Sequence, residues 1–206
     1  MDELLFPLLS LARHRIGTVG QGVTTLVAGA GCPLHCRWCI NARLLREAAA
    51  EAVTAEELIK KVSIDDLYFR ATGGGVTFGG GEPLLHARFI RRFHELCPDE
   101  WRICVETSLA VPREQLREAL AAVDIFLVDC KDMNEEIYHR YTGGDGSLMR
   151  NNLQFLLGNT DAGHVIVRVP GIPEYNTRED QQKSREQLLA MGVQRLDVFD
   201  YVVKKK

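Results

Sequence analysis

Three cysteines lie within one short stretch of the chain, at Cys32, Cys36 and Cys39. Closely spaced thiolates are ligands for a metal centre that prefers sulfur. A structural zinc ion would need a fourth ligand, and the nearest candidate, His35, lies between two of the cysteines and cannot easily turn inward with them. A four-iron cluster usually takes four cysteines, so three cysteines leave one iron open to a small chelating molecule. The pattern favours such a cluster and keeps zinc as the alternative.

A glycine-rich stretch from Gly73 to Pro83 is the second candidate for binding chemistry. It lacks the Lys-Ser/Thr pair of a phosphate-binding loop, and its glycines do not fit the dinucleotide-binding pattern. Gly80 and Gly81 instead allow the backbone to approach a ligand closely, with Glu82 as an acceptor for a cationic group. A tight turn between a strand and a helix is the alternative interpretation of these glycines.

Charged residues also end several apolar segments further along the chain. Glu106 and Asp129 are carboxylates at such ends, and a buried carboxylate needs a cation, a hydrogen-bond donor or water. Lys131 and Arg168 are basic residues in the equivalent places and are candidates to pair with these acids or with the carboxylate of a ligand. Structural ion pairing at the rim of a sheet is the alternative.

Six short apolar segments rich in Val, Ile, Leu and Phe predict the strands that would position these residues. They alternate with helical patterns, which implies an α/β fold with a parallel sheet and right-handed crossovers, either doubly wound or curved into a partial barrel. Ligands of both architectures bind at the carboxyl ends of the strands, and the polar residues above follow five of the six segments. The predicted strands are Val23–Ala28, Gly75–Phe78, Arg102–Thr107, Ile125–Cys130, Val165–Val169 and Leu196–Tyr201.

Helix signals lie between these strands. Thr54 and Glu57 form a capping-box pattern, Pro112 suits a first helical turn, and Asn134 suits an N-cap. Apolar residues at Leu85, Phe89 and Phe93 recur every four positions, as on one face of a helix. Two further helices are predicted at residues 148–157 and 178–191.

The composition is that of an ordinary globular protein, with 206 residues of which 46% are hydrophobic and 26% charged. We expect one domain over residues 1–206. The net charge of -3 gives no reason to expect nucleic acid as a partner. No apolar run is long enough to span a membrane, and the N-terminus is a poor signal peptide, so a cytoplasmic location is expected. In that reducing compartment Cys97, Cys104 and Cys130 are predicted to be core thiols.

The C-x3-C-x2-C spacing after a strand, with Trp38 before the last cysteine, resembles the signature of the radical S-adenosylmethionine (SAM) superfamily. The resemblance implies a partial (β/α)6 TIM-like barrel, short at its C-terminus, with a core at about residues 17–201. It implies a 4Fe–4S cluster whose open iron binds the amino and carboxylate groups of SAM. Reduction then breaks a carbon–sulfur bond and yields methionine and a 5′-deoxyadenosyl radical that abstracts hydrogen from a substrate.

Later motifs resemble those of the glycyl-radical-enzyme activases, and most closely the pyruvate formate-lyase activating enzymes. The motifs run from Gly75-Val-Thr-Phe to Val167-Arg-Val-Pro-Gly-Ile-Pro173 in the order found in that family. The resemblance implies a partner glycyl radical enzyme as the hydrogen donor, in an anaerobic setting, and a flavodoxin or ferredoxin-type reductant. A small molecule or peptide as substrate, and a non-catalytic iron–sulfur or zinc-binding module, are the alternatives.

The resemblance also assigns roles to individual residues. Cys32, Cys36 and Cys39 correspond to the cluster ligands, and Trp38 corresponds to the aromatic residue beside the adenosine. The SAM contacts implied are Gly80, Gly81 and Glu82 at the methionine amine, Asp129 and Lys131, Arg168 near the carboxylate, and Glu106, Thr107 and Ser108 at one strand end. Glu106, Thr107 and Asp129 also stand where activases bind a monovalent cation. Lys131 is counted with the cysteines as catalytic.

Several departures from the family pattern are visible. The stretch Val19-Gly-Gln-Gly22 replaces Asp-Gly-Pro-Gly before the first strand, and Val202 stands where relatives have a histidine that approaches SAM. Glu106, Leu109 and Glu174 also differ from the usual residues, and the sequence is short at the C-terminus. The missing closing segment bears on the surface that would face the partner, so SAM cleavage is matched more completely than the activase role.

Overall fold

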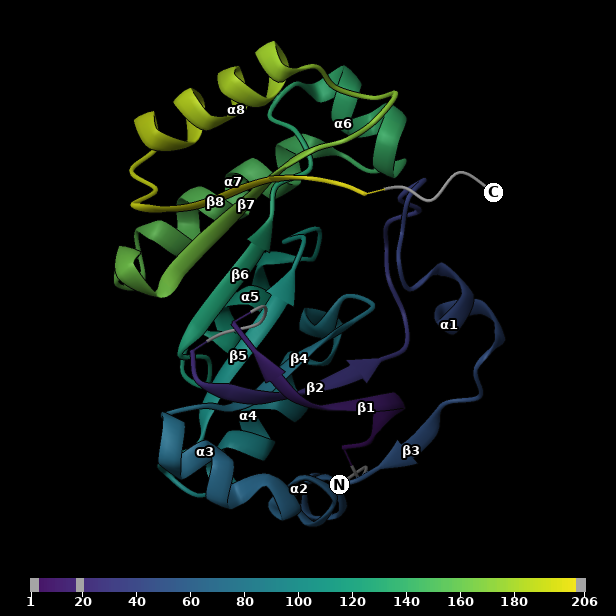
Figure 1. Ribbon diagram of the computed structural model, residues 1–206, viewed down its shortest axis with the longest axis vertical. Helices are drawn as coiled ribbons and strands as arrows, with labels where there is room; N and C mark the ends of the chain where they lie inside the picture. The colour runs from purple at the N-terminus through teal and green to yellow at the C-terminus, as the bar shows by residue number, and fades with distance from the viewer. Residues whose placement is uncertain (1–3, 18–20, 203–206) are drawn as a thin grey trace.

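The computed structural model describes residues 4–17 and 21–202. The departure at Val19 therefore falls partly outside the described residues. One eight-stranded sheet runs through the described part, in the order β3-β1-β2-β4-β5-β6-β7-β8 (Figure 1). Its strands are β1 (Phe6–Ile16), β2 (Val23–Gly29), β3 (Glu51–Val53), β4 (Gly75–Gly80), β5 (Arg102–Thr107), β6 (Ile125–Asp129), β7 (Val165–Gly171) and β8 (Arg195–Asp200).

The six predicted strands are confirmed as β2 and β4–β8, with ends that differ by at most two residues. Each pairs with its neighbour in parallel. The outer strands β3 and β8 are the two ends of the strand order, so the sheet is open. The predicted α/β fold with a partial barrel is therefore confirmed.

The expectation that the sheet holds six strands is wrong, because β1 and β3 extend it at the N-terminal edge. β1 pairs antiparallel with both β2 and β3. Its sequence does not alternate regularly, since the pairing with β2 shifts register between Leu8 and Ser10 and again between Ala12 and Arg15. Such shifts disturb the period of two that marks a half-buried strand. β3 has three residues and is too short to leave a pattern.

Helices fill the connections (Figure 1), with α6, α7 and α8 at one end of the molecule and α2, α3 and α4 at the other. Thr54 forms the predicted capping box, and Asn134 accepts hydrogen bonds from the amides of Glu136 and Ile137. Leu85 lies in a preceding 3-10 turn instead of the predicted helix. Neither α1 nor α3 was predicted, because each spans fewer than two helical turns. The helices are α1 (Ala42–Glu47), α2 (Ala55–Val62), α3 (Asp66–Thr72), α4 (Ala87–Leu96), α5 (Arg113–Ala119), α6 (Glu135–Thr142), α7 (Gly146–Leu157) and α8 (Arg178–Ala190), with 3-10 turns η1 (Ser63–Asp65), η2 (Pro83–His86) and η3 (Ala162–His164).

Aromatic side chains join β1 and β4 to helix α4 in the core. Phe6, Phe78, Phe89 and Phe93 are buried, and the ring centroids of successive partners lie 5.1 to 5.6 Å apart. Burial of one such ring stabilises the fold by about 1.5–3 kcal/mol. The N-terminal strand β1 is thus fixed to the sheet. Because β1 pairs with β2, which leads to the cysteines, the start of the cysteine segment is fixed as well. Within the described ranges, no helix is long and apolar enough to cross a membrane.

Candidate active site

The cysteine segment follows β2 and is held by the C-terminal end of α6. The amide of His35 donates to the carbonyl oxygen of Thr142 at 2.8 Å, and the amide of Arg37 donates to that of Tyr141 at 3.1 Å. The last carbonyls of a helix have no partner within the helix, so they are available to a neighbouring segment. Leu34, directly before the first anchor, is buried. The position of the cysteines therefore depends on main-chain contacts to α6.

The three thiols are half-buried and lie near a positive charge. Burial raises the pKa of Cys36 to about 11, and Lys131 acts in the opposite direction. Burial also raises the pKa of Cys32. Among the described residues, no group of three or more His, Cys, Asp or Glu side chains converges on a single metal position. Three thiols on one short loop match the donor set of an iron–sulfur cluster in which each of three irons takes one thiolate.

The Gly80-Gly81-Glu82 turn lies against the start of the cysteine segment. The amide of Gly81 donates to the Gly29 carbonyl at 3.0 Å, and the amide of Glu82 donates to the Gly31 carbonyl at 2.8 Å. Gly80 has a φ of +90°, a conformation that favours glycine. This turn thereby fixes the backbone directly before Cys32.

Gly81→Ala should disturb this arrangement, because its added Cβ would overlap the carbonyl oxygen of Gly31. Overpacking of this kind costs about 1–3 kcal/mol. We expect a lower free energy of unfolding in chemical denaturation and a lower iron content after reconstitution. Gly158→Ala is the matched control, since its Cβ would meet nothing closer than 3.6 Å. Equal stability and iron content in both variants would contradict the role given to Gly81.

Glu82 is 2% exposed, and both of its carboxylate oxygens are used within the protein. Oε1 accepts from the hydroxyl of Thr107 at 2.6 Å and from the amide of Leu84 at 3.2 Å. Oε2 accepts from the hydroxyl and the amide of Ser108, at 2.6 and 2.8 Å. Burial raises the pKa of Glu82, while these donors oppose the rise. Glu82 therefore joins the turn after β4 to the end of β5.

A row of alternating charges crosses the ends of β5, β6 and β7. Arg168 contacts Glu106 at 3.0 Å and Asp129 at 3.5 Å, and Lys131 Nζ donates to Asp129 at 2.9 Å. Burial opposes the charge of Asp129, but the attraction of Lys131 and Arg168 outweighs it and lowers its pKa. Burial opposes the charge of Lys131, but Asp129, Tyr201 and Cys36 together outweigh it and raise the pKa of Lys131. The predicted meeting of acids and bases is thus found in the structure.

The predicted cation residues have other contacts in this arrangement. The guanidinium of Arg168 lies between Glu106 and Asp129, and the hydroxyl of Thr107 donates to Glu82. The monovalent cation stays a prediction. Trp38 is 36% exposed and donates from Nε1 to the carbonyl of Pro173 at 3.3 Å. Its place beside an adenosine is likewise a prediction.

Tyr201 and Asn41 belong to the site but were not singled out from the sequence. The Tyr201 hydroxyl accepts from Lys131 Nζ at 3.1 Å, and Asn41 donates to the Gly80 carbonyl at 2.8 Å. Tyr201 carried a usable signal, since it follows the last strand as polar residues follow the other five. Asn41 carried none, because its contact depends on how the cysteine segment folds back.

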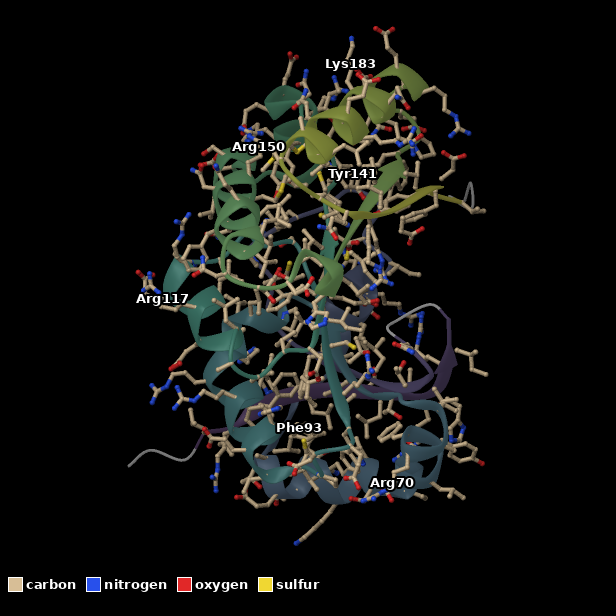
Figure 2. All side chains as sticks on the ribbon, turned by 90° about the vertical axis from the view of Figure 1, so that its left-hand side faces the viewer. Arg70, Phe93, Arg117, Tyr141, Arg150 and Lys183 are labelled. Carbon is tan, nitrogen blue, oxygen red and sulfur yellow. The ribbon has the colours of Figure 1, made fainter. Side chains whose placement is uncertain are left out.

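The site residues are thus brought together in two linked groups, one around Glu82 and one around Asp129. Tyr141, beside the cysteine segment, lies at the end of the molecule that carries α8, far from Phe93 in the opposite end of the core (Figure 2).

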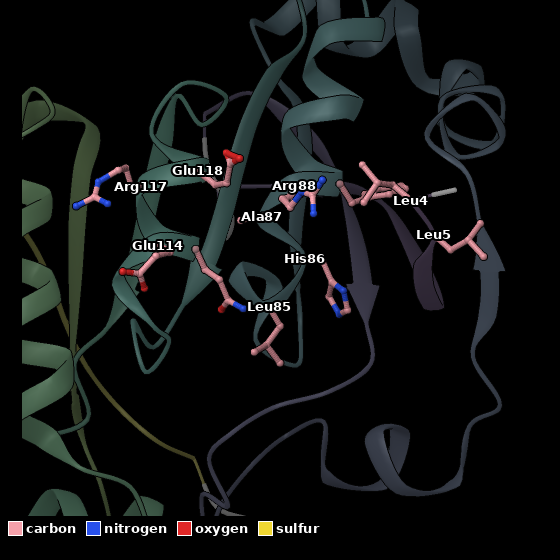
Figure 3. Close-up of a pocket in the computed structure, with 11 residues that line it drawn as sticks. Leu4, Leu5, Leu85, His86, Ala87, Arg88, Glu114, Arg117 and Glu118 are labelled. Atoms are coloured by element: carbon pink, nitrogen blue, oxygen red, sulfur yellow. The ribbon is translucent and has the colours of Figure 1, made fainter. Parts of the chain in front are cut away.

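A cavity of about 700 Å³ lies elsewhere, between η2, the start of α4 and α5 (Figure 3). None of the predicted site residues lines it.

Comparison with known proteins gives matches to one family. The model described as the Radical SAM superfamily matches residues 26–180. The chain is 33% identical over 127 residues to the (2S)-3-sulfopropanediol dehydratase activating enzyme of Klebsiella oxytoca, covering 61% of this chain and 39% of that protein. It is 34% identical over 131 residues to the pyruvate formate-lyase 1-activating enzyme of Escherichia coli K12, covering 62% of this chain and 53% of that protein.

Solved structures support the fold independently of close sequence similarity. Streptococcus suis SuiB bound to S-adenosylmethionine matches with a TM-score of 0.65 at 13% identity, over 84% of this chain and 39% of that chain. At this identity the likeness concerns the fold alone. The chain also spans about half or less of the length of the two activating enzymes it matches.

Proposed function

Because the chain belongs to the radical SAM superfamily, we propose that it reductively cleaves S-adenosylmethionine and abstracts hydrogen from a substrate. The cofactors of this family are a 4Fe–4S cluster and S-adenosylmethionine. Cys32, Cys36 and Cys39 would hold the cluster, and their half-buried thiols on one loop fit that role. When bound, the cluster supplies one electron to the sulfonium of SAM, which is the chemistry that the protein side chains lack.

The protein contributes binding and orientation. Arg168 and Lys131 would supply positive charge for the carboxylate of SAM, and the Gly80–Glu82 turn is proposed to hold its amine. Asp129 holds Lys131 in place through the 2.9 Å contact. Trp38 would cover the adenosine. Fixing both ends of the ligand in this way positions the reacting methylene, which is the main contribution that geometry makes to rate.

The observation that carries the proposal is the proximity of the cysteine segment to the charged row at the strand ends. Lys131 is among the strongest charged neighbours of Cys36. A cluster held by these cysteines would then lie next to the charged groups that we propose bind SAM. A purely structural metal loop would not need this row, which argues against the non-catalytic module.

Anaerobic reconstitution of the full chain tests the proposal directly. We expect about four irons per chain, and methionine and 5′-deoxyadenosine in equal amounts after reduction with dithionite in the presence of SAM. Iron measurement and chromatography of the products give the two readouts. A colourless protein that retains zinc, or a cluster that leaves SAM intact, would overturn it.

The hydrogen donor proposed is a glycine of a partner glycyl radical enzyme in the cytoplasm. The proposed reductant of the cluster is a flavodoxin or ferredoxin-type protein, and the partner then carries the radical. The activating enzymes named above support this choice. The test is electron paramagnetic resonance of a glycyl radical enzyme from the same organism, incubated with the reconstituted chain and SAM. We expect a glycyl-radical doublet that is absent when SAM is omitted. Cleavage of SAM without that doublet would support SAM cleavage by this chain but refute a glycyl radical enzyme as its partner.

A further inference from the structure

Tyr138 has a buried hydroxyl that the fold does not use. The side chain is 0% exposed and lies in the second turn of α6. Among the residues that the structure describes, its hydroxyl has no hydrogen-bond partner. A buried hydroxyl without a partner is costly, so natural proteins rarely keep one without a reason. Phenylalanine would fill the same space without this cost.

The ring of Tyr138 is directed toward the cysteine segment. A Cβ on Gly146 would lie 3.2 Å from Cγ, at the base of the ring. A Cβ on Gly144 would lie 3.6 Å from Cε1, next to the hydroxyl, and would also collide with Leu34. The edge of the ring next to the hydroxyl and the side chain of Leu34 therefore both border Gly144, and Leu34 lies between Cys32 and Cys36 in the chain.

The backbone of α6 fixes this orientation. Tyr141 and Thr142, whose carbonyls hold the cysteine segment, lie one turn after Tyr138 on the same helix face. The Thr142 hydroxyl donates to the carbonyl of Tyr138 at 2.8 Å. After burial, Cys36 is the strongest titratable neighbour that raises the pKa of Tyr138. The ring and the cysteine segment are thus supported by the same helix turn.

We propose that the Tyr138 hydroxyl donates a hydrogen bond to a sulfur atom of the bound cluster and thereby sets its reduction potential. This inference rests on the proposed cluster site. Hydrogen bonds to the sulfurs are one of the factors that tune iron–sulfur potentials, because they stabilise the more negative reduced state. Tyr138 is a positioning and tuning residue in this role, and it does not contact the substrate.

The test is a redox titration of the reconstituted full chain without SAM, followed by electron paramagnetic resonance. We expect Tyr138→Phe to hold as much iron as the unchanged chain but to have a more negative midpoint. A tenfold lower ratio of reduced to oxidised cluster at a fixed potential corresponds to 59 mV for one electron. Tyr68→Phe is the matched control, because Tyr68 is an exposed tyrosine on α3. Its midpoint should not move.

A second variant keeps the test decisive if Tyr138→Phe fails to hold a cluster. Incorporation of 3-fluorotyrosine at position 138 retains the ring and makes the hydroxyl a stronger donor, so the midpoint should shift in the positive direction. An unchanged midpoint in a cluster-loaded Tyr138→Phe or fluorotyrosine protein overturns this inference and leaves the proposed function standing. Failure of the unchanged chain to assemble any four-iron cluster overturns both.

Discussion

Cys36→Ala is expected to abolish the cluster and, with it, all cleavage of SAM. Cys36 is the middle cysteine of the segment. Lys131 and both other cysteines are among the neighbours whose charges shift the pKa of its thiol. Removal leaves two thiolates for a cluster that is ordinarily held by four. Iron content after anaerobic reconstitution and the yield of 5′-deoxyadenosine are the measurements, and both should fall to background.

Cys97→Ala is the matched control for that loss. Cys97 is a buried thiol outside the cysteine segment, where it follows α4 and donates to the carbonyl of His94. Burial raises its pKa to about 11, as expected of a core thiol. The control should keep its iron and its cleavage of SAM. A catalytic four-iron cluster in Cys36→Ala would show that the ligands have been assigned wrongly.

Glu82→Gln is expected to lower the free energy of unfolding by about 1.5–3 kcal/mol, the usual contribution of a hydrogen bond to a charged group. Each oxygen of Glu82 accepts from a backbone amide, one from Leu84 and the other from Ser108. A glutamine must turn its own NH2 group toward one of these amides. The two hydroxyl groups can rotate, but a backbone donor cannot. Chemical denaturation of the two proteins measures the loss.

The same substitution should weaken SAM binding by about tenfold, equivalent to 1.4 kcal/mol, because the Gly80–Glu82 turn is no longer fixed to β5. Calorimetric titration of the cluster-loaded protein measures this affinity. Glu47→Gln is the control, since Glu47 is exposed and pairs with Arg43 one turn away. Such surface pairs contribute about 0–1 kcal/mol. If Glu82→Gln unfolds at the same denaturant concentration as the unchanged chain, the buried carboxylate does not stabilise the site as described.

The parallel part of the sheet was predictable because its strands are buried on both faces. Such strands appear as short apolar runs, and Ile125–Asp129 and Arg102–Thr107 were located within one residue. β1 was not predictable, since its two register shifts break the alternation and its outer half is exposed. Local patterns identify elements well when burial is uniform along them and poorly when it changes.

The sequence indicated which residues would converge at the candidate site, but not which of them contact one another. The rule that ligands bind at the carboxyl ends of parallel strands indicated Glu82, Asp129 and Arg168 without any knowledge of their contacts. The contact of Glu82 with Thr107 and Ser108 joins the ends of two strands, and it depends on the angle at which the chain leaves β4. Arg168 contacts Glu106 and Asp129, with Asp197 at 4.0 Å, and only the spacing of the strands decides which acids it reaches.

The attachment of the cysteine segment to α6 through backbone atoms has a consequence for how this protein tolerates change. The anchoring atoms are the amides of His35 and Arg37, while both side chains are exposed. Substitutions at these two positions alter the outer surface of the segment without removing either anchor. Evolution is thereby free to vary what this surface meets while the backbone of the cysteine segment keeps its shape. Changes of a few outward-facing side chains would then be enough to alter which molecules this face of the protein contacts.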